Sequence, residues 1–153
     1  MNTFSSINPA PILIVEDEED HARLITRSLI ASGNITNELI HLKNGEDAMN
    51  YLKKEEKYKG DKNVLPALIL LDVKMPMKNG FEVLRELKTD TNFKKIPVVM
   101  LTTTSTSEDI NKAMSLGAND YIVKPVKFND FTSKVQSLGF YWGTVSDSGK
   151  INI

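Results

Sequence analysis

The sequence predicts an α/β domain with a doubly wound, five-stranded parallel sheet in the order 2-1-3-4-5. Two observations carry this prediction. Short apolar runs rich in Val, Ile and Leu recur along the chain, which is typical of strands buried on both faces of a parallel sheet. Segments with helical apolar spacing separate these runs, so that strand and helix alternate as (βα)5. Right-handed crossovers then give the doubly wound arrangement.

The individual elements follow from these two patterns. We place strands at 12–15, 67–71, 98–101 and 121–123, with a weaker candidate at 39–42. Helices are expected at 20–31, at 46–54, at 81–87, between Ser105 and Gly117, and at 128–138. The fourth helix should begin at a capping box formed by Ser105 and Glu108. The apolar positions that define the first helix are Ala22, Ile25, Leu29 and Ile30, and those of the fourth are Ile110, Ala113 and Met114.

Length and composition fit one globular domain of 153 residues, 41% of them hydrophobic. The net charge of −1 indicates no general attraction to nucleic acid, and the lack of Cys excludes disulfides and thiol chemistry. We find no signal peptide and no apolar run near the ~20 residues that span a bilayer. We therefore expect a cytoplasmic domain without membrane contact. Residues 1–10 form an N-terminal extension, 11–139 the domain, and 140–153 an aromatic and polar tail.

Polar residues stand where four of the apolar runs stop. Glu16 and Asp17 follow the first run, Asp72 the third, Thr102 the fourth and Lys124 the fifth. In the predicted strand order these four strands are neighbours, and ligands bind at the carboxyl ends of such strands. We therefore expect the five side chains to line one crevice.

These residue types suit phosphoryl chemistry. Carboxylates that crowd together repel one another, and a hard divalent cation such as Mg²⁺ relieves the repulsion. One carboxylate can then attack a phosphoryl group and form an acyl phosphate, while Thr102 and Lys124 contact the phosphoryl oxygens. Each residue alone also has a structural explanation, such as an acidic helix start or a turn Asp. Their coincidence at one sheet edge favours the functional interpretation.

Four sequence motifs occur in order along the chain: ILIVED at 12–17, LLDVKMPMKNG at 70–80, VMLTT at 99–103 and GANDYIVKP at 117–125. Together they resemble the receiver domain of two-component response regulators, the CheY-like superfamily with its flavodoxin-like fold. The resemblance covers about residues 10–139, which correspond to the domain at 11–139.

The resemblance implies a metal site around the acceptor. Asp72 would be the phosphoacceptor and a Mg²⁺ ligand, Asp17 a direct ligand, and Glu16 a ligand mainly through water. The backbone carbonyl of Lys74 would be a further ligand. Glu16 departs from the more common Asp, which a water-mediated contact should tolerate.

The resemblance also implies a switch. Thr102 and Lys124 would contact the phosphoryl group, and Tyr121 would be the aromatic residue that turns inward. The protein would then be no enzyme beyond its own phosphorylation and dephosphorylation. A sensor histidine kinase would supply the phosphoryl group, and the fourth helix, fifth strand and fifth helix would form the output surface. The partner there would be a downstream protein, a phosphotransfer protein or a second copy, since the chain is too short for a DNA-binding output domain.

Three further points complete the interpretation. Three features together resemble the stand-alone regulators that pair with bacterial and cyanobacterial phytochrome kinases: the loop at 53–65, the Leu-Thr-Thr run at 101–103 and the aromatic tail at 140–142. A phosphohydrolase of the haloacid-dehalogenase type would need an Asp where Lys74 stands, and a pseudo-receiver would have lost part of the acceptor set. His21 and His41 have no Cys or His partners at metal-ligand spacing, so we interpret both as surface residues.

Overall fold

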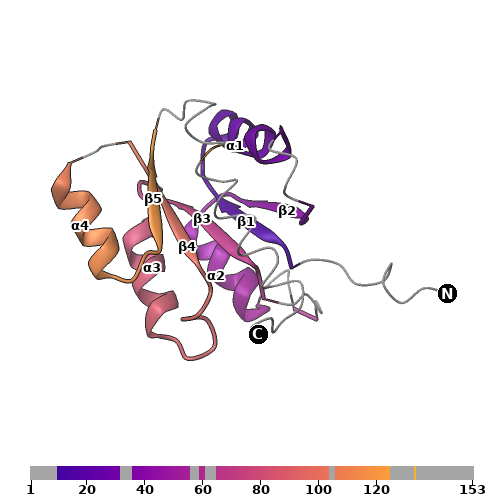
Figure 1. Cartoon of the computed structure of the whole chain (residues 1–153). Helices are drawn as coiled ribbons and strands as arrows, with labels where there is room; N and C mark the ends of the chain where they lie inside the picture. The colour runs from indigo at the N-terminus through magenta and orange to yellow at the C-terminus, as the bar shows by residue number, and fades with distance from the viewer. Residues whose placement is uncertain are drawn as a thin grey trace, which may run out of the picture.

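The computed structural model describes residues 10–31, 36–55, 59–60, 65–103, 106–124 and 133. Within these ranges, five parallel strands form one sheet in the order β2-β1-β3-β4-β5 (Figure 1). The predicted fold class and strand order are therefore confirmed. The strands are β1 (Ile12–Val15), β2 (Leu39–Leu42), β3 (Leu68–Asp72), β4 (Val98–Thr102) and β5 (Asp120–Val123).

In the part of the chain that the structure describes, four helices connect or follow these strands. They are α1 (Glu19–Ala31), α2 (Gly45–Lys53), α3 (Gly80–Thr89) and α4 (Ser107–Ser115). The fifth expected helix, at 128–138, lies outside the described residues apart from Ser133, which is helical. The tail at 140–153 and Pro125 also lie outside them. The predicted loop at 53–65 lies partly outside them, at 56–58 and 61–64. None of the helices in the described ranges has the length and apolar character needed to cross a membrane.

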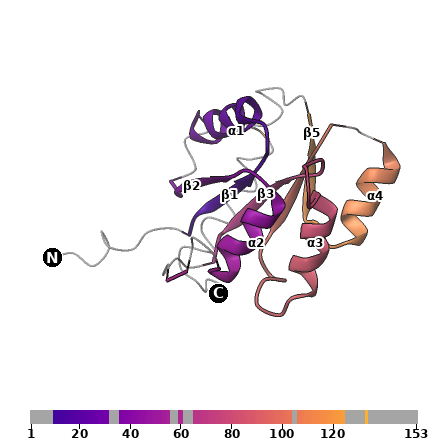
Figure 2. The same ribbon diagram turned by 180° about the vertical axis from the view of Figure 1, so that it is seen from behind.

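Both faces of the sheet are buried, because helices pack on each of them. Successive side chains along a strand point to opposite faces, so each strand contributes residues to both cores. In β1, Leu13 and Val15 join the core under α2, α3 and α4, whereas Ile12 and Ile14 join the core under α1. Figures 1 and 2 show α1 on one side of the sheet and α2 with α3 on the other. This double burial explains why the strands are continuous apolar runs rather than alternating ones.

The pairing register brings the carboxyl ends of four strands together. Asp72 is the last residue of β3 and pairs with Leu101, and Thr102 at the end of β4 pairs with Val123. We expected β3 to stop one residue before Asp72, but Asp72 is part of the ladder. Its backbone is therefore fixed by the sheet, and its side chain starts from a rigid position.

Gly80 allows α3 to begin against the backbone of the acceptor residue. A Cβ at this position would lie 2.2 Å from the carbonyl oxygen of Asp72, which no side chain tolerates. The Gly80 amide donates to the carbonyl of Val73 at 2.8 Å. The loop between β3 and α3 therefore closes back on the end of β3, and only glycine fits there.

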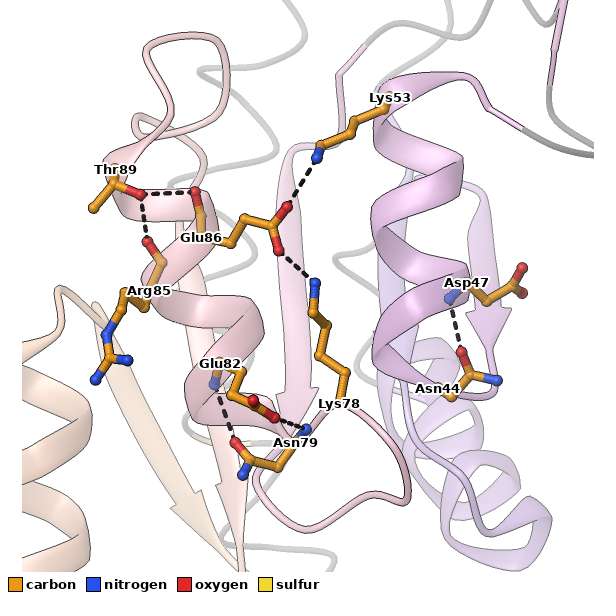
Figure 3. Close-up of polar contacts among 9 residues, drawn as sticks. All are labelled: Asn44, Asp47, Lys53, Lys78, Asn79, Glu82, Arg85, Glu86 and Thr89. Atoms are coloured by element: carbon orange, nitrogen blue, oxygen red, sulfur yellow. Dashed lines mark hydrogen bonds and ion pairs between the residues drawn. The ribbon is translucent and has the colours of Figure 1, made fainter.

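Helix α3 is also tied to α2 by charge (Figure 3). The Glu86 carboxylate accepts from Lys53 at 2.8 Å and from Lys78 at 2.6 Å. Hydrogen bonds from these two ammonium groups lower the pKa of Glu86. Because Lys78 belongs to the β3–α3 loop, Glu86 fastens that loop to the helix pair beside it.

The expected start of the fourth helix was wrong. The N-cap of α4 is Thr106, whose hydroxyl accepts from the Asp109 amide at 3.3 Å, so the predicted box of Ser105 and Glu108 does not start this helix. The capping box occurs instead at α3, between Asn79 and Glu82 (Figure 3).

Two apolar residues that were expected on buried helix faces are exposed. The exposed fraction is 64% for Ile30 in α1 and 43% for Met114 in α4. In α1 the buried stripe runs through Ala22, Ile25, Ser28 and Leu29, and Ile30 is rotated away from it by about a quarter turn.

Candidate functional site

Four of the predicted site residues are buried side by side at the carboxyl edge of the sheet. Glu16 follows β1, Asp72 ends β3, Thr102 ends β4 and Lys124 follows β5. Their exposed fractions are 0%, 3%, 4% and 6%. Asp17, the fifth member, is exposed. The predicted convergence of these residues is therefore what the structure shows, although their roles are a separate question.

The ammonium of Lys124 stands between two buried carboxylates. Its Nζ donates to Glu16 Oε1 at 2.9 Å and forms an ion pair with Asp72 Oδ1 at 3.2 Å. Two negative charges and one positive charge are thus enclosed together, and burial strengthens their interactions relative to water. This arrangement retains a net negative charge.

The electrostatic consequence is greatest for Asp72. Burial first, and then the neighbouring Glu16 carboxylate, raise the pKa of Asp72 to about 7, although Lys124 acts in the opposite direction. Burial lowers the pKa of Lys124, but hydrogen bonds and charges from Glu16 and Asp72 outweigh it, so that the pKa is raised. Lys124 therefore keeps its proton, whereas Asp72 changes its charge near neutral pH.

The carboxylates fit a hard divalent cation. Glu16, Asp17 and Asp72 each offer a carboxylate oxygen, and these three atoms lie within 4.8 Å of one another. Oxygen donors of this kind suit Mg²⁺, Mn²⁺ or Ca²⁺, and the exposed Asp17 gives an ion access from solvent. A cation here would also offset the repulsion that burial imposes on Asp72.

Two other predicted residues lie at the margin of the site. The side chain of Lys74 is exposed on the loop after β3, and the role of its backbone carbonyl as a ligand stays a prediction. Tyr121 lies in β5 and packs, partly buried, against the core under α2, α3 and α4. Its role as a switch is likewise a prediction.

Sequence reasoning missed contacts of both histidines. His21 has a side chain that is 41% exposed, yet its Nδ1 lies 3.2 Å from Lys124 Nζ and 3.7 Å from Glu16 Oε2. His41 in β2 places Nε2 2.7 Å from the Glu16 carbonyl oxygen. A carbonyl only accepts, so this Nε2 carries a proton and donates. No pattern in the sequence pointed to the His21 contact, because Lys124 lies 103 residues further along the chain.

Comparison with known proteins connects this site to a family. The family described as "Response regulator receiver domain" matches residues 12–136. The chain is 37% identical over 135 residues to the probable methanogenesis regulatory protein FilR2 of Methanothrix harundinacea, covering 88% of this chain and 84% of FilR2. It is also 37% identical over 134 residues to response regulator Rcp1 of Synechocystis sp., covering 88% and 89% of the two chains.

Solved structures agree with the sequence relatives. The Mn²⁺-bound form of Rcp1 superposes with a TM-score of 0.75 at 36% identity and covers 88% of this chain and 95% of Rcp1. The phosphorylated cyanobacterial phytochrome response regulator RcpA superposes with a TM-score of 0.74 at 36% identity, covering 88% and 94%. These likenesses agree with the resemblance to phytochrome-associated regulators that the sequence indicated.

Receiver domains are signalling switches of two-component systems that are phosphorylated on an aspartate, bind a divalent metal and work with histidine kinases. A buried acidic site of the kind described above stands at the end of a five-stranded sheet in this chain. On its match to the family over residues 12–136, the chain belongs to the response regulator receiver domain family.

Proposed function

We propose that this chain is a phosphorylation switch in which Asp72 accepts a phosphoryl group from a sensor histidine kinase. The observation that carries the proposal is the setting of Asp72. The residue is 3% exposed, and its Oδ1 lies 3.2 Å from Lys124 Nζ. One carboxylate oxygen each from Asp72, Glu16 and Asp17 lie within 4.8 Å of one another. An Asp that merely ends a strand would be solvated and would have no such neighbours.

The chemistry begins with an oxygen of the Asp72 carboxylate. It attacks phosphorus, the bond from phosphorus to the donor histidine nitrogen breaks, and an acyl phosphate forms. Only the ionised carboxylate is nucleophilic. Because the pKa of Asp72 is raised, anything that favours its ionised form increases the reactive fraction. Glu16, Asp17, Asp72 and the Lys74 carbonyl would hold Mg²⁺, which when bound neutralises charge on the phosphoryl oxygens and favours ionised Asp72.

Lys124 and Thr102 would receive the new phosphoryl group. Lys124 is already 3.2 Å from Asp72, so a small rotation redirects one of its N–H donors to a phosphoryl oxygen. Thr102 is buried at the end of the neighbouring strand and supplies a hydroxyl donor. Its movement toward the phosphate would leave room for Tyr121 to turn inward.

The output surface would be formed by α4, β5 and the chain that follows. Of the α4 residues, all of which are described, Ala113 alone is buried. A helix with so little buried surface can shift at a low free-energy cost, which makes α4 a suitable element for a two-state equilibrium. Phosphorylation would bias that equilibrium and so control binding of a downstream protein, a phosphotransfer protein or a second copy.

The kinase partner is proposed from the relatives. RcpA is by its printed name a phytochrome response regulator, and FilR2 is described as a methanogenesis regulatory protein. We propose a phytochrome-type sensor kinase as the first candidate, because the bacteriophytochrome response regulator RtBRR is 40% identical to this chain and RcpA is 36% identical.

The test is phosphorylation in the absence of any kinase. Purified protein is incubated with acetyl phosphate and Mg²⁺, and intact mass is recorded with and without EDTA. We expect wild type to gain one phosphoryl group in the presence of Mg²⁺ and none with EDTA. The control Asp20→Asn should behave in the same way, because the Asp20 side chain is 94% exposed and is not part of the proposed site. We expect Asp72→Asn to gain none. Equal labelling of wild type and Asp72→Asn, or no labelling of wild type, would overturn the proposal.

A further inference from the structure

We propose that His21 is a positioning residue that holds Lys124 through a hydrogen bond accepted by its Nδ1. The inference deepens the proposed function, on which its kinetic part rests, because Lys124 is the cation expected to meet the phosphoryl group. His21 lies in the first turns of α1, 103 residues away from Lys124 in the sequence. None of the motifs that identify the family includes it.

The argument starts from the needs of a buried ammonium. A lysine ammonium has three N–H donors and no acceptor, and leaving one donor without a partner in a buried place is costly. Lys124 is 6% exposed. Glu16 Oε1 at 2.9 Å and Asp72 Oδ1 at 3.2 Å take two donors, and His21 Nδ1 at 3.2 Å takes the third.

The contact also defines the state of the imidazole. An ammonium can only donate, so Nδ1 must offer its lone pair and the ring proton must be on Nε2. Two carboxylates compete for this Nδ1, because each would require a proton on it: Glu18 Oε1 at 3.3 Å and Glu16 Oε2 at 3.7 Å. Glu18 is 59% exposed, and Glu16 lies farther away and already accepts from Lys124, so the loss of the buried Lys124 contact is the greater cost.

The geometry has a consequence for phosphoryl transfer. Glu16 and Asp72 are charged partners that both draw the ammonium toward the carboxylates. His21 is a neutral third partner on the α1 side, and it fixes where Nζ stands relative to Asp72. Removing it frees one donor and lets the ammonium tilt, so that Lys124 is less well aimed when the phosphoryl group arrives.

A pair of substitutions separates this role from simple packing. The Oδ1 of an Asn side chain can occupy nearly the position of His Nδ1, so His21→Asn keeps an acceptor, whereas His21→Leu removes it at similar volume. Because the His21 side chain is 41% exposed, neither change removes core packing, and thermal unfolding checks that both variants fold.

The first readout needs no phosphorylation. The side-chain ammonium of Lys124 is observed by ¹H–¹⁵N NMR in metal-free protein, with Lys124→Met used to assign the signal. We expect a protected signal in wild type and in His21→Asn, and a signal lost to exchange in His21→Leu. Equal protection in all three proteins would overturn the proposal, as would equal loss in both His21 variants.

The second readout is the rate of phosphorylation by acetyl phosphate at saturating Mg²⁺. We expect His21→Leu to be about five- to tenfold slower and His21→Asn to be within about twofold of wild type. Mg²⁺ affinity measured by calorimetry should be unchanged in both. If wild type itself accepts no phosphate, the proposed function fails while the NMR result still decides the role of His21. If wild type is phosphorylated and His21→Leu matches it, the positioning role fails alone.

Discussion

Replacing Asp72 with Asn should make the metal-free protein more stable, because wild type must bury a carboxylate whose ionisation the fold opposes. The pKa of Asp72 is raised from 3.8 to about 7 by burial and by Glu16. Each pKa unit corresponds to about 1.36 kcal/mol, so keeping Asp72 fully ionised costs at most about 4 kcal/mol of folding free energy. Asn removes that cost and can still accept from Lys124. We expect a gain of about 2–4 kcal/mol above neutral pH.

The difference in unfolding free energy between the variant and wild type should depend on pH. The native pKa lies above the unfolded one, so the native state binds the additional proton between about pH 4 and pH 7. Wild-type stability contributed by Asp72 is therefore present below about pH 4 and is lost as the pH rises toward 7. The variant lacks this loss. The stability difference should grow with pH through that window and level off above it.

Urea unfolding in EDTA across this pH range is the assay, with Asp20→Asn as the control for removing an exposed carboxylate. Saturating Mg²⁺ should then narrow the gap, since an ion at 100 times its dissociation constant stabilises by about 2.7 kcal/mol and wild type should bind it better. A less stable Asp72→Asn variant, or a gap that does not change with pH, would refute the reasoning that burial and Glu16 raise the pKa of Asp72.

Three further predictions test other contacts in the structure. Gly80→Ala should cost about 2 kcal/mol or more in urea unfolding, because its Cβ would meet the Asp72 carbonyl oxygen at 2.2 Å; Gly60→Ala, with open space but a φ of +90°, should cost about 1 kcal/mol. Equal costs would contradict the close approach. Lys124→Met should destabilise the metal-free protein by about 3–5 kcal/mol, since two buried carboxylates lose their cation, and Mg²⁺ should restore part of this; an unchanged unfolding midpoint would argue against the ion pairs. Glu86→Gln should cost less than about 1 kcal/mol, and that cost should shrink in high salt, because its two lysine partners are partly exposed.

The fold could be predicted because its signals are local and repeated. Strands buried on both faces are continuous apolar runs, and the rule that strand and helix alternate leaves few topologies. The site followed from the same logic, since strand ends that share a sheet edge bring Asp72, Thr102 and Lys124 together.

The features that could not be predicted depend on three-dimensional contacts between distant parts of the chain. The contact from His21 to Lys124 joins residues 103 positions apart, and nothing in either neighbourhood predicts it. The predicted start of α4 was wrong for a different reason. Ser and Thr are both good N-cap residues, so residue type does not distinguish position 105 from position 106, and the cap of α4 is Thr106. The exposure of Ile30 reflects its rotation from the stripe that the sheet covers.

The central claim is that Asp72, among the 20 acidic residues of the chain, is the one that carries the phosphoryl group. The direct measurement is to phosphorylate the full chain with acetyl phosphate and Mg²⁺, reduce the acyl phosphate with borohydride, and map the product by peptide mass spectrometry. Reduction converts a phosphorylated Asp to homoserine. We predict homoserine at position 72 alone, and none in Asp72→Asn. Homoserine at another aspartate, or none in wild type, would contradict the account.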